Sequence, residues 1–398
     1  MRILFADAIE EDRLETLRAA GHETVVDASL SADELPSAIG GFDVLVVRST
    51  KVTADTIASA DRLGLITRAG AGTDNIDIDA ASQRGIYVCN VPGRNAIAVA
   101  ELAMGLLLAI DRQIPDNVAD LRNQAWDKKR YTKADGIYGK TMAVIGLGEI
   151  GLAVAERAKA FGMTVLAERK PRTADALARI RSTGVQLVDS LDEMLSQADV
   201  VSLHVPKSPA TTGMVDAAFL AKLPAGAILL NTARGDLVVG QDLLAALDAG
   251  LRAGLDVYPN EPAASQGAFQ STLATHPRVV GTHHIGASTE QAQRAIAEGT
   301  IDVIENYAAG RVQNCVNLID EALGTCVLSV RHVDRVGVLA KVFADLRNAG
   351  CNIQQMQNQV FLGSAAAVAS INVEGELSPE LLAKIESDDD IIAVSVAH

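Results

Sequence analysis

Short apolar runs and longer amphipathic segments alternate along most of the chain. Between residues 140 and 283, runs rich in valine, isoleucine and leucine predict strands at 142–146, 163–167, 199–205, 227–231 and 251–257. Segments 152–161 and 241–249 show helical spacing between such runs. Strands that are apolar along their whole length are typical of parallel sheets covered by helices on both faces. This stretch therefore predicts a doubly wound α/β domain.

The same βα rhythm fills the first hundred residues, and a different order of elements follows near the C-terminus. Strands are predicted at 3–6, 44–47, 65–68 and 87–88, and a helix at 98–114 would leave this first unit for the second. The C-terminal order is strand 327–331, helix 338–349, strands 353–360 and 365–373, helix 379–385 and strand 391–396. We therefore predict two Rossmann-like doubly wound parallel-sheet domains and a ferredoxin-like βαββαβ domain.

Charge and composition narrow the class of protein. The 398 residues carry 50 acidic against 35 basic side chains, a net charge of −15, which excludes general binding to nucleic acid or anionic membranes. The N-terminus lacks the apolar core of a signal peptide, and the apolar stretch at 99–110 is too short to span a bilayer. The four cysteines show no C-x-x-C spacing, so we expect reduced thiols and no metal site. These features predict a cytoplasmic enzyme.

A glycine-rich loop is the first candidate binding site. Gly146, Gly148 and Gly151 form a G-x-G-x-x-G motif with Glu149 and Ile150 inside it, directly after a predicted strand and before a predicted helix. In that context the first glycine permits a tight turn, the second admits a pyrophosphate, and the third lets helix and strand pack closely. The loop therefore predicts a dinucleotide site in which the helix N-terminus faces the pyrophosphate.

The position that selects between NAD and NADP departs from the usual pattern. An acidic residue about 20 positions after the motif normally accepts the ribose 2′-hydroxyl of NAD. Here that position is Arg169, which follows Glu168 and precedes Lys170 and Arg172. A cationic cluster suits the 2′-phosphate of NADP. Alternatively, Glu168 reaches the ribose and the basic residues form a solvated loop. We expect NAD and leave NADP open.

Three polar residues that follow predicted strands have the chemistry of one reaction. Arg234, Glu261 and His284 lie where ligands of open α/β sheets bind. A histidine can take the hydroxyl proton of a 2-hydroxy acid, and a carboxylate beside it favours the imidazolium that forms. A guanidinium clamps the substrate carboxylate. As alternatives, Arg234 caps a helix, Glu261 is a loop charge, or His283 is the base.

The segments around these residues resemble the D-2-hydroxyacid dehydrogenase family. N-T-A-R-G at 231–235, D-V-Y-P-N-E-P at 256–262 and H-I-G-A-S at 284–288 follow G-L-G-E-I-G at 146–151, and the resemblance covers about residues 1–320. It implies Arg234 as substrate-binding arginine, His284 as general acid/base and Glu261 as its partner. It also implies further cofactor contacts at Val205, Thr232, Ala233, Asp256 and Gly286.

The resemblance also implies a discontinuous domain that the βα pattern does not reveal. Residues 1–98 and 284–320 would form the substrate domain, residues 99–283 the nucleotide-binding domain, and residues 324–398 a separate C-terminal domain.

Within the family, the segments V-R-S-T-K-V-T at 47–53 and R-A-G-A-G-T-D-N at 68–75 resemble the branch that acts on 3-phosphoglycerate. Arg48 and Arg68 would oppose a dianionic phosphate, and backbone N–H groups of a glycine-rich loop would bind the carboxylate. Both arginines could instead form surface ion pairs. The basic run 128–130 could complete the phosphate site across a dimer interface or be a solvated loop. The candidate substrate-binding residues are Arg48, Ser49, Arg68, Ala71, Gly72 and Asn95.

The C-terminal segment 328–396 resembles an ACT domain, a small module that binds amino acids. By this resemblance His332, Asp334 and Asn352 would bind L-serine. Asp334 stands where some members have asparagine, and Val336 replaces a proline, so the loop lacks a fixed φ. The alternative is a dimerisation module with no ligand. ACT units usually pair, so a homodimer or homotetramer is expected.

The working hypothesis is oxidation of 3-phosphoglycerate to 3-phosphohydroxypyruvate with NAD(P), the first step of serine biosynthesis, with serine as feedback inhibitor. A rival of the same class is an NADPH-dependent reductase of glyoxylate or hydroxypyruvate. A rival of another class is a non-catalytic scaffold that senses NAD(H) or serine, against which intact Arg234, Glu261 and His284 argue.

Overall fold

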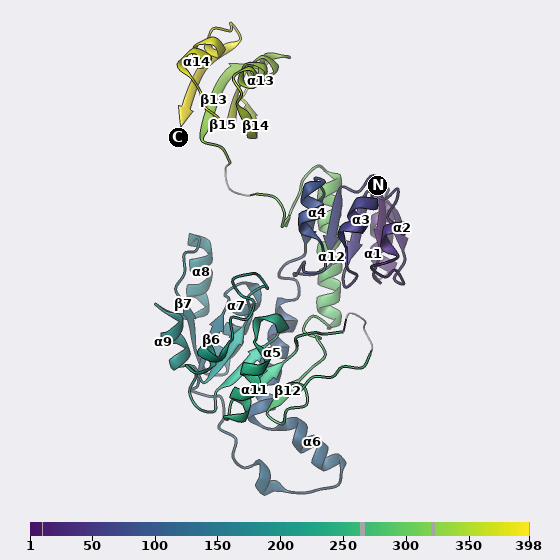
Figure 1. Cartoon of the computed structure of the whole chain (residues 1–398), viewed down its shortest axis with the longest axis vertical. Coiled ribbons are helices and arrows are strands. Elements are labelled where there is room, and N and C mark those ends of the chain that lie inside the picture. The colour runs from purple at the N-terminus through teal and green to yellow at the C-terminus, as the bar shows by residue number, and fades with distance from the viewer. Residues whose placement is uncertain (10, 263–266, 320–322, 398) are drawn as a thin grey trace. The chain divides into compact units, whose positions relative to one another are not determined.

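The computed structural model describes residues 1–9, 11–262, 267–319 and 323–397. It divides into two compact units, Met1–Asn317 and Leu318–His398. The first unit contains two parallel sheets and the second a single antiparallel sheet (Figure 1). In the described part of the chain, none of the helices combines the length and apolarity that crossing a membrane requires.

The first sheet has the order β2-β1-β3-β4-β5, with all strands parallel. Its elements are β1 (Arg2–Phe5), α1 (Glu11–Ala19), β2 (Glu23–Val26), α2 (Leu35–Ala38), β3 (Val44–Val47), α3 (Ala54–Ser59), β4 (Leu65–Arg68), α4 (Ile78–Gln83) and β5 (Tyr87–Asn90). One face packs against α2, α3 and α4 through Leu35, Ile57 and Ala81. The other face packs against α1 and against α12 (Glu290–Ala308), whose Ile301 and Ile304 share a buried cluster with the strands. The chain therefore returns to this sheet after it completes the second one.

The second sheet has the order β12-β11-β10-β9-β6-β7-β8 and is also parallel throughout. Its elements are α5 (Ala96–Asp111), α6 (Ile114–Arg122), η1 (Lys128–Tyr131), β6 (Thr141–Ile145), α7 (Glu149–Ala160), β7 (Thr164–Glu168), α8 (Ala174–Thr183), β8 (Gln186–Val188), α9 (Leu191–Ser196), β9 (Val200–Leu203), α10 (Ala217–Leu220), β10 (Ile228–Asn231), η2 (Gly235–Leu237), α11 (Gly240–Asp248), β11 (Arg252–Leu255) and β12 (Val279–Gly281). Strand order reverses between β6 and β9. Ligands of open α/β sheets bind at such a switch point, outside the carboxyl ends of the strands.

Two sequence predictions about elements need correction. The helix predicted over 98–114 ends at Asp111, because Gln113 adopts a left-handed φ of 50° and a second helix with Pro115 in its first turn begins at Ile114. A proline cannot continue the preceding helix, since it has no N–H and its ring clashes with the carbonyl four residues earlier. The short strands β2, β8 and β12 were not predicted. All three lie at sheet edges and are half-exposed, so they lack a continuous apolar run.

The second unit has the βαββαβ order that the sequence predicts. Its elements are β13 (Cys326–Val333), α13 (Val338–Asn348), β14 (Asn352–Val360), β15 (Ala366–Glu374), α14 (Pro379–Glu386) and β16 (Ile391–Ala397), with sheet order β14-β15-β13-β16. Burial alternates along β13 and β15, so one face of the sheet forms the core with the two helices. The predicted fold class, two doubly wound parallel sheets followed by a ferredoxin-like unit, is confirmed.

Candidate active site

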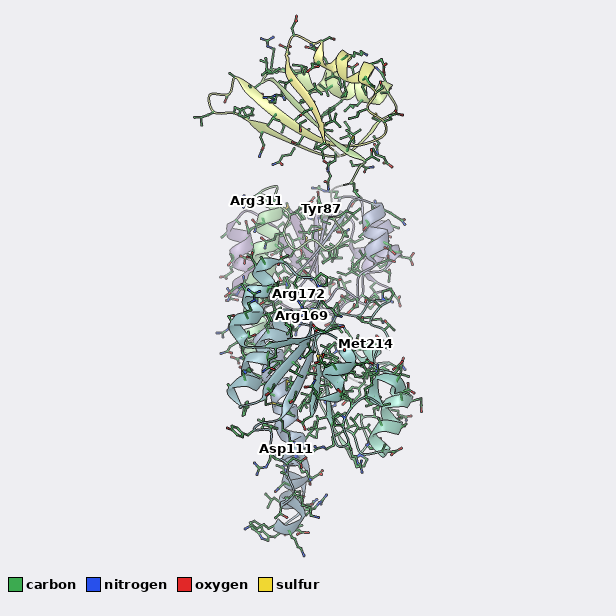
Figure 2. The ribbon with its side chains drawn as sticks, turned by 90° about the vertical axis from the view of Figure 1, so that its left-hand side faces the viewer. Tyr87, Asp111, Arg169, Arg172, Met214 and Arg311 are labelled. Carbon is green, nitrogen blue, oxygen red and sulfur yellow. The ribbon has the colours of Figure 1, made fainter. Side chains whose placement is uncertain are left out.

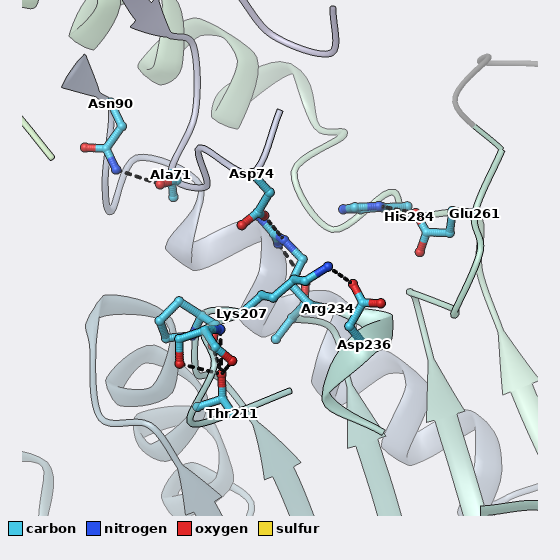
Figure 3. A network of polar contacts seen from close by, with 12 residues as sticks. Ala71, Asp74, Asn90, Lys207, Thr211, Arg234, Asp236, Glu261 and His284 are labelled. Carbon is cyan, nitrogen blue, oxygen red and sulfur yellow. Dashed lines mark hydrogen bonds and ion pairs between the residues drawn. The ribbon is translucent and has the colours of Figure 1, made fainter. Parts of the chain in front are cut away.

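A histidine–carboxylate pair lies beyond the ends of β11 and β12. Nδ1 of His284 is 2.7 Å from Oε2 of Glu261, whose other oxygen accepts the backbone N–H of Tyr258 at 2.7 Å (Figure 3). Burial opposes ionisation of Glu261, but hydrogen bonds from His284 and Tyr258 outweigh it and hold the pKa of this carboxyl below its usual 4.5. An ionised carboxylate can only accept, so Nδ1 carries the proton of the neutral ring and Nε2 is its basic atom.

Asp256 holds the loop that presents His284. Its buried carboxylate accepts the Thr282 hydroxyl at 2.6 Å and the backbone N–H groups of Ile285 and Gly286 at 2.8 and 2.9 Å. The backbone carbonyl of Asp256 accepts the N–H of His284, which has a left-handed φ of 53°. Four contacts from one residue therefore fix a strained backbone, which is typical of a loop that must aim a side chain.

Arg234 connects the two parallel sheets of the first unit. It follows β10, and Asn231 holds its turn by donating from the side-chain amide to the Arg234 carbonyl at 2.8 Å. Nε of Arg234 donates to Asp74 at 2.6 Å, in the loop after β4 (Figure 3). The guanidinium also lies over Gly72, where a Cβ would be 1.8 Å from Nη2. The chain thus brings an arginine of the second sheet onto the glycine-rich loop of the first.

Three arginines form a cluster around this loop. Burial first, and then the charges of Arg234 and Arg48, lower the pKa of Arg68 to about 10, against the opposing charges of Asp74 and Asp7. Nε of Arg68 is buried and has no hydrogen-bond partner among the described residues. Arg68 is thus a half-buried cation beside two others, and its Nε donor is unsatisfied within the described part of the chain. This environment favours a polyanionic ligand.

The remaining predicted substrate residues lie on neighbouring loops. Ser49 follows β3, and its N–H donates to the carboxylate of Asp7 at 3.1 Å. The side-chain amide of Asn90 donates to the Ala71 carbonyl at 2.6 Å and so braces the loop after β4. Asn95 precedes α5, and its buried Oδ1 has no hydrogen-bond partner among the described residues. The structure therefore gathers the predicted residues at the carboxyl ends of β3, β4 and β5.

The glycine motif forms the tight turn between β6 and α7 that a dinucleotide requires. Gly146 has a φ of 98°, and a Cβ there would lie 2.4 Å from the His204 carbonyl oxygen. A Cβ at Gly151 would lie 1.9 Å from the Gly146 carbonyl oxygen, whereas a Cβ at Gly148 would have no described atom within 4 Å apart from its two chain neighbours. The first and third positions are therefore closed by the protein itself, and the second is open at the N-terminus of α7, where a pyrophosphate binds.

An acidic residue of this motif is neutralised by a neighbouring helix. Arg179 of α8 donates two hydrogen bonds to the carboxylate of Glu149, at 2.6 and 2.7 Å. These bonds lower the pKa of Glu149 more than its partial burial raises it. The carboxylate is thus compensated, although it lies in the first turn of α7 beside the position for an anion.

The candidate ribose site lies at the end of β7, where Arg169 and Arg172 lie close together (Figure 2). Arg169 donates to Asp189 at 2.9 Å, so its charge is already paired. Arg172 donates to backbone carbonyls, including that of Glu168 at 3.1 Å. The Glu168 carboxylate contacts Lys170 at 2.9 Å. The basic run is therefore engaged within the protein, and Glu168 is the acidic residue at the strand end.

Strand ends on the other side of the motif supply further candidate cofactor contacts. His204 precedes Val205, and desolvation lowers the pKa of its ring to about 4, so it is neutral at ordinary pH. Nε2 of His204 lies 2.7 Å from the Ser202 hydroxyl. Thr232 has a buried hydroxyl with no partner among the described residues, and Ala233 beside it is half-buried. A dinucleotide fits here, because its polar groups can satisfy that hydroxyl.

The structure does not bring the three candidate effector residues together within one chain. His332 lies opposite Ala367 on β15, whereas Asn352 lies opposite Glu374, seven residues further along that strand. At about 3.4 Å per residue this separates them by roughly 24 Å. Asp334 lies close to His332, just after β13. The ring of His332 is buried and contacts the Val333 carbonyl at 2.8 Å and Asn358 Oδ1 at 3.2 Å.

Several residues that organise the site were not predicted from the sequence, namely Asp7, Asp74, Asn90 and Thr282. Asp7 illustrates why: it accepts backbone N–H groups from Arg48, Ser49 and Thr50, so its role depends on the pairing of β1 with β3. The available signal was its position directly after an apolar strand, the same signal that identified Arg234.

Comparisons with known proteins agree with this geometry. Residues 104–286 match the family model described as D-isomer specific 2-hydroxyacid dehydrogenase, NAD binding domain. A D-3-phosphoglycerate dehydrogenase from Methanocaldococcus jannaschii is 43% identical over 331 residues, which are 81% of this chain and 61% of that protein. This chain therefore spans about three fifths of the length of that relative. A hydroxypyruvate reductase from Thermotoga maritima is 40% identical over 76% of this chain and 96% of its own length.

Solved structures show the same architecture. The crystal structure of the TT0316 protein from Thermus thermophilus superposes with a TM-score of 0.69 at 34% identity, over 79% of this chain and all of that one. D-lactate dehydrogenase from Aquifex aeolicus, solved with NAD and lactic acid, has a TM-score of 0.69 at 25% identity and covers 80% of this chain. With a matching NAD-binding domain and a 40% identical relative covered almost end to end, this chain belongs to the D-isomer specific 2-hydroxyacid dehydrogenase family.

Proposed function

We propose that this chain is a D-3-phosphoglycerate dehydrogenase, which oxidises 3-phosphoglycerate to 3-phosphohydroxypyruvate with NAD in the first step of serine biosynthesis. The assignment of the substrate rests on the cluster of Arg48, Arg68 and Arg234 around the loop after β4. A substrate with one carboxylate needs a single clamp, whereas a phosphate adds two charges that the further arginines can bind. Several relatives carry this enzyme's name, including the one from Methanocaldococcus jannaschii.

The chemistry of the proposed reaction follows from the charges of the site. Bound NAD supplies the acceptor for the hydride that leaves C2 of the substrate. Arg234 clamps the substrate carboxylate and polarises the C2 oxygen as its negative charge develops. Nε2 of His284 takes the hydroxyl proton, and Glu261 stabilises the resulting imidazolium through Nδ1 at 2.7 Å. In this proposal Asp74 positions Arg234 by accepting from Nε at 2.6 Å, and the Ala233 carbonyl does so by accepting from Nη1 at 2.7 Å, so that Nη2 is left for the substrate.

We further propose that NAD is preferred over NADP. Asp189 neutralises Arg169, and Glu168 offers a carboxylate at the end of β7 that can accept the two ribose hydroxyls. A 2′-phosphate would meet that carboxylate with like charge. The charges of Arg169 and Lys170 are thus paired with carboxylates of the chain, whereas Arg172 donates to uncharged backbone carbonyls.

The domain organisation and assembly belong to the same proposal. Residues 1–98 with 284–320 would form the substrate domain, 99–283 the nucleotide-binding domain and 324–398 an ACT domain, in a cytoplasmic homodimer or homotetramer. Helix α6 supports self-association, because it buries none of its side chains in this chain and exposes Ile114, Val118 and Leu121 at helical spacing. Trp126 nearby is 82% exposed. A second copy would cover this apolar face.

A serine site, if it uses His332, Asp334 and Asn352, would have to form between two copies of the chain. The first two residues lie roughly 24 Å from the third along β15, too far for one amino acid to reach both. Strand β14 is an exposed edge of its sheet and can approach another copy. Serine inhibition that disappears when the chain is made monomeric would support this arrangement.

A second candidate function is reduction of hydroxypyruvate, which the relative from Thermotoga maritima favours because this chain covers 96% of its length. Purified protein should be assayed with 3-phosphoglycerate, hydroxypyruvate and glyoxylate, each with both cofactors. The Arg68→Met variant separates the candidates, since only the phosphorylated substrate needs this cation. Losing one charge-assisted contact of 1.5–3 kcal/mol should lower kcat/KM for 3-phosphoglycerate by roughly 10- to 150-fold.

The matched control is Arg62→Met, which removes the same charge from an exposed pair with Asp43. It should leave all rates within about twofold. Hydroxypyruvate turnover should change little in Arg68→Met. Absence of 3-phosphoglycerate oxidation by the unaltered chain would overturn the proposed substrate.

A further inference from the structure

Two cysteines that are 226 positions apart in the sequence lie side by side in the first unit. Cys89 belongs to β5, and Cys315 belongs to the segment that follows α12 and leads toward the second unit. The two residues form an isolated antiparallel bridge. Hydrogen bonds from Asn90 N–H to the Asn314 carbonyl at 3.1 Å and from Val316 N–H to the Val88 carbonyl at 2.8 Å flank the pair.

This pattern fixes the distance between the two cysteine backbones. The flanking residues exchange the hydrogen bonds and the cysteines do not, so the cysteines occupy a non-hydrogen-bonded position of an antiparallel pair. Cα atoms at such positions are about 4.5 Å apart and their side chains point to the same face. Disulfides span Cα separations of about 4.4–6.8 Å. The backbone spacing typical of this position therefore lies within the range that disulfides span.

The two cysteines share one buried cluster and differ in access. Burial first, and then the charge and hydrogen bond of Cys315, raise the pKa of Cys89 to about 12. Cys89 is 1% exposed, whereas Cys315 is half-buried, and its thiol lies 3.1 Å from Asn317 Oδ1. A reagent can therefore reach Cys315 from solvent, and Cys89 lies behind it as the second thiol.

We propose that Cys89 and Cys315 form a redox site that a low-molecular-weight disulfide converts into a reversible intramolecular disulfide. The Cys315 thiolate attacks one sulfur of the external disulfide and expels the first external thiolate. Cys89 then loses its proton and attacks Sγ of Cys315, which expels the second external thiolate; the raised pKa of Cys89 makes this the slower step. The two cysteine protons end on the two released thiols, so two protein thiols are oxidised and one external disulfide is reduced.

The bond would tie the segment 314–317 to β5. A cross-link between residues so far apart in sequence removes much conformational freedom from the unfolded chain, so it should stabilise the first unit. Cys89 also precedes Asn90, which braces the Ala71 loop of the candidate active site. Reversible disulfides of this kind in reducing compartments are typically redox-sensing.

The other two cysteines supply a matched control. Cys326 lies on β13 opposite Val373 of β15, and Cys351 directly precedes β14, on the other side of β15. Two strand spacings separate them by roughly 9–10 Å, beyond the reach of a disulfide. Both are buried, as is Cys89. Simple proximity within a sheet therefore predicts one oxidisable pair and one inert pair.

The test uses the full chain, reduced and then incubated with glutathione disulfide at mildly alkaline pH. Maleimide labelling in denaturant, followed by peptide mass mapping, should find two free cysteines instead of four and a cross-link between the peptides that contain Cys89 and Cys315. Dithiothreitol should restore four. The unfolding temperature of the oxidised chain should rise by several degrees. Cys351→Ala should behave like the unaltered chain.

The single variants test the order of attack. They also distinguish loss of the redox site from a defect in folding. Cys315→Ser should take up no glutathione and show no rise in unfolding temperature. Cys89→Ser should retain glutathione on Cys315 as a mixed disulfide. Four labelled cysteines in the unaltered chain after oxidation, glutathione retained on its Cys315, or a cross-link to Cys326 or Cys351 would each overturn the proposal.

Discussion

A methyl group added at Gly72 should displace Arg234 and reduce activity while the fold stays intact. A Cβ at this position would lie 1.8 Å from Nη2 and 3.1 Å from Cζ of Arg234. Ordinary carbon contacts begin at about 3.5 Å, so the end of the guanidinium must move by more than about 1.5 Å. The conflicting atoms are the far end of a flexible side chain, and the backbone of Gly72 is not in the left-handed region. The added methyl group should therefore displace the guanidinium of Arg234 and leave the backbone of Gly72 unstrained.

The size of the effect follows from the role proposed for Arg234. A displacement of about 1 Å in a positioning group lowers a rate by roughly 100-fold. We expect Gly72→Ala to lower kcat/KM for 3-phosphoglycerate by about two orders of magnitude. The dissociation constant of NAD should stay within about twofold, because Gly72 lies in the loop after β4 of the first sheet, whereas the glycine motif lies between β6 and α7 of the second.

The assay is steady-state NADH formation, combined with thermal unfolding and fluorescence titration of the cofactor. The control is Gly105→Ala in α5, where, apart from the adjoining residues and the backbone of the helix itself, no described atom lies within 4 Å of the added Cβ. Its activity should be unchanged and its stability equal or slightly higher, since alanine favours helix more than glycine does. If kcat/KM of Gly72→Ala stayed within threefold of the unaltered enzyme, the position assigned to Arg234 would be wrong.

Three further predictions concern the cofactor, pH and the histidine loop. Asp189→Ala should free Arg169 and raise the ratio of kcat/KM for NADP to that for NAD by about three- to tenfold. The reason is that an exposed ion pair of up to roughly 1 kcal/mol is lost and one negative charge is removed. An unchanged ratio would place Arg169 away from the ribose. The pKa of His204 falls from 6.5 to about 4 on folding, so the unfolded state binds more protons between these two pH values, and stability should decline as the pH falls from 6.5 to 4. The variant His204→Gln should flatten that part of the pH profile of urea denaturation. An unaltered slope would contradict the burial of His204 as a neutral ring. Asp256→Asn should lower the free energy of unfolding, measured in urea, by about 1–3 kcal/mol. Both carboxylate oxygens of Asp256 accept hydrogen bonds, whereas an amide has only one accepting oxygen and leaves one loop N–H or hydroxyl unsatisfied. Equal midpoints would show that the loop does not depend on the charge.

Local sequence patterns were sufficient to predict the structure where one short segment forms both the secondary-structure elements and the binding site. The turn at Gly146 to Gly151 was predicted because a strand, a tight turn and a helix follow one another within a few residues, and each leaves its own mark on the sequence. The buried strands β3 and β4 coincide with their predicted ranges because apolar residues occupy them without interruption. Edge strands such as β2 escaped prediction, because their exposed faces remove that pattern.

The pairing of charges around the candidate cofactor site was beyond sequence reasoning. The run at Arg169 suggested a site for NADP, yet Asp189, at the end of the neighbouring strand, engages that guanidinium. The pair depends on β7 and β8 lying next to each other in register. A one-residue change in that register would turn Asp189 toward the other face of the sheet.

The sequence by itself determined the two parallel sheets, the C-terminal βαββαβ unit and the residue types of the candidate site, because hydrophobic periodicity and glycine turns act over a few residues. Only the tertiary structure decided which distant residues meet. Arg234 meets Asp74, helix α12 returns to the first sheet, and Cys89 meets Cys315. Each of these contacts joins segments whose local patterns are independent of one another, and burial of the shared core brings them together. Contact between such segments is a property of the packed chain, so no local pattern encodes it.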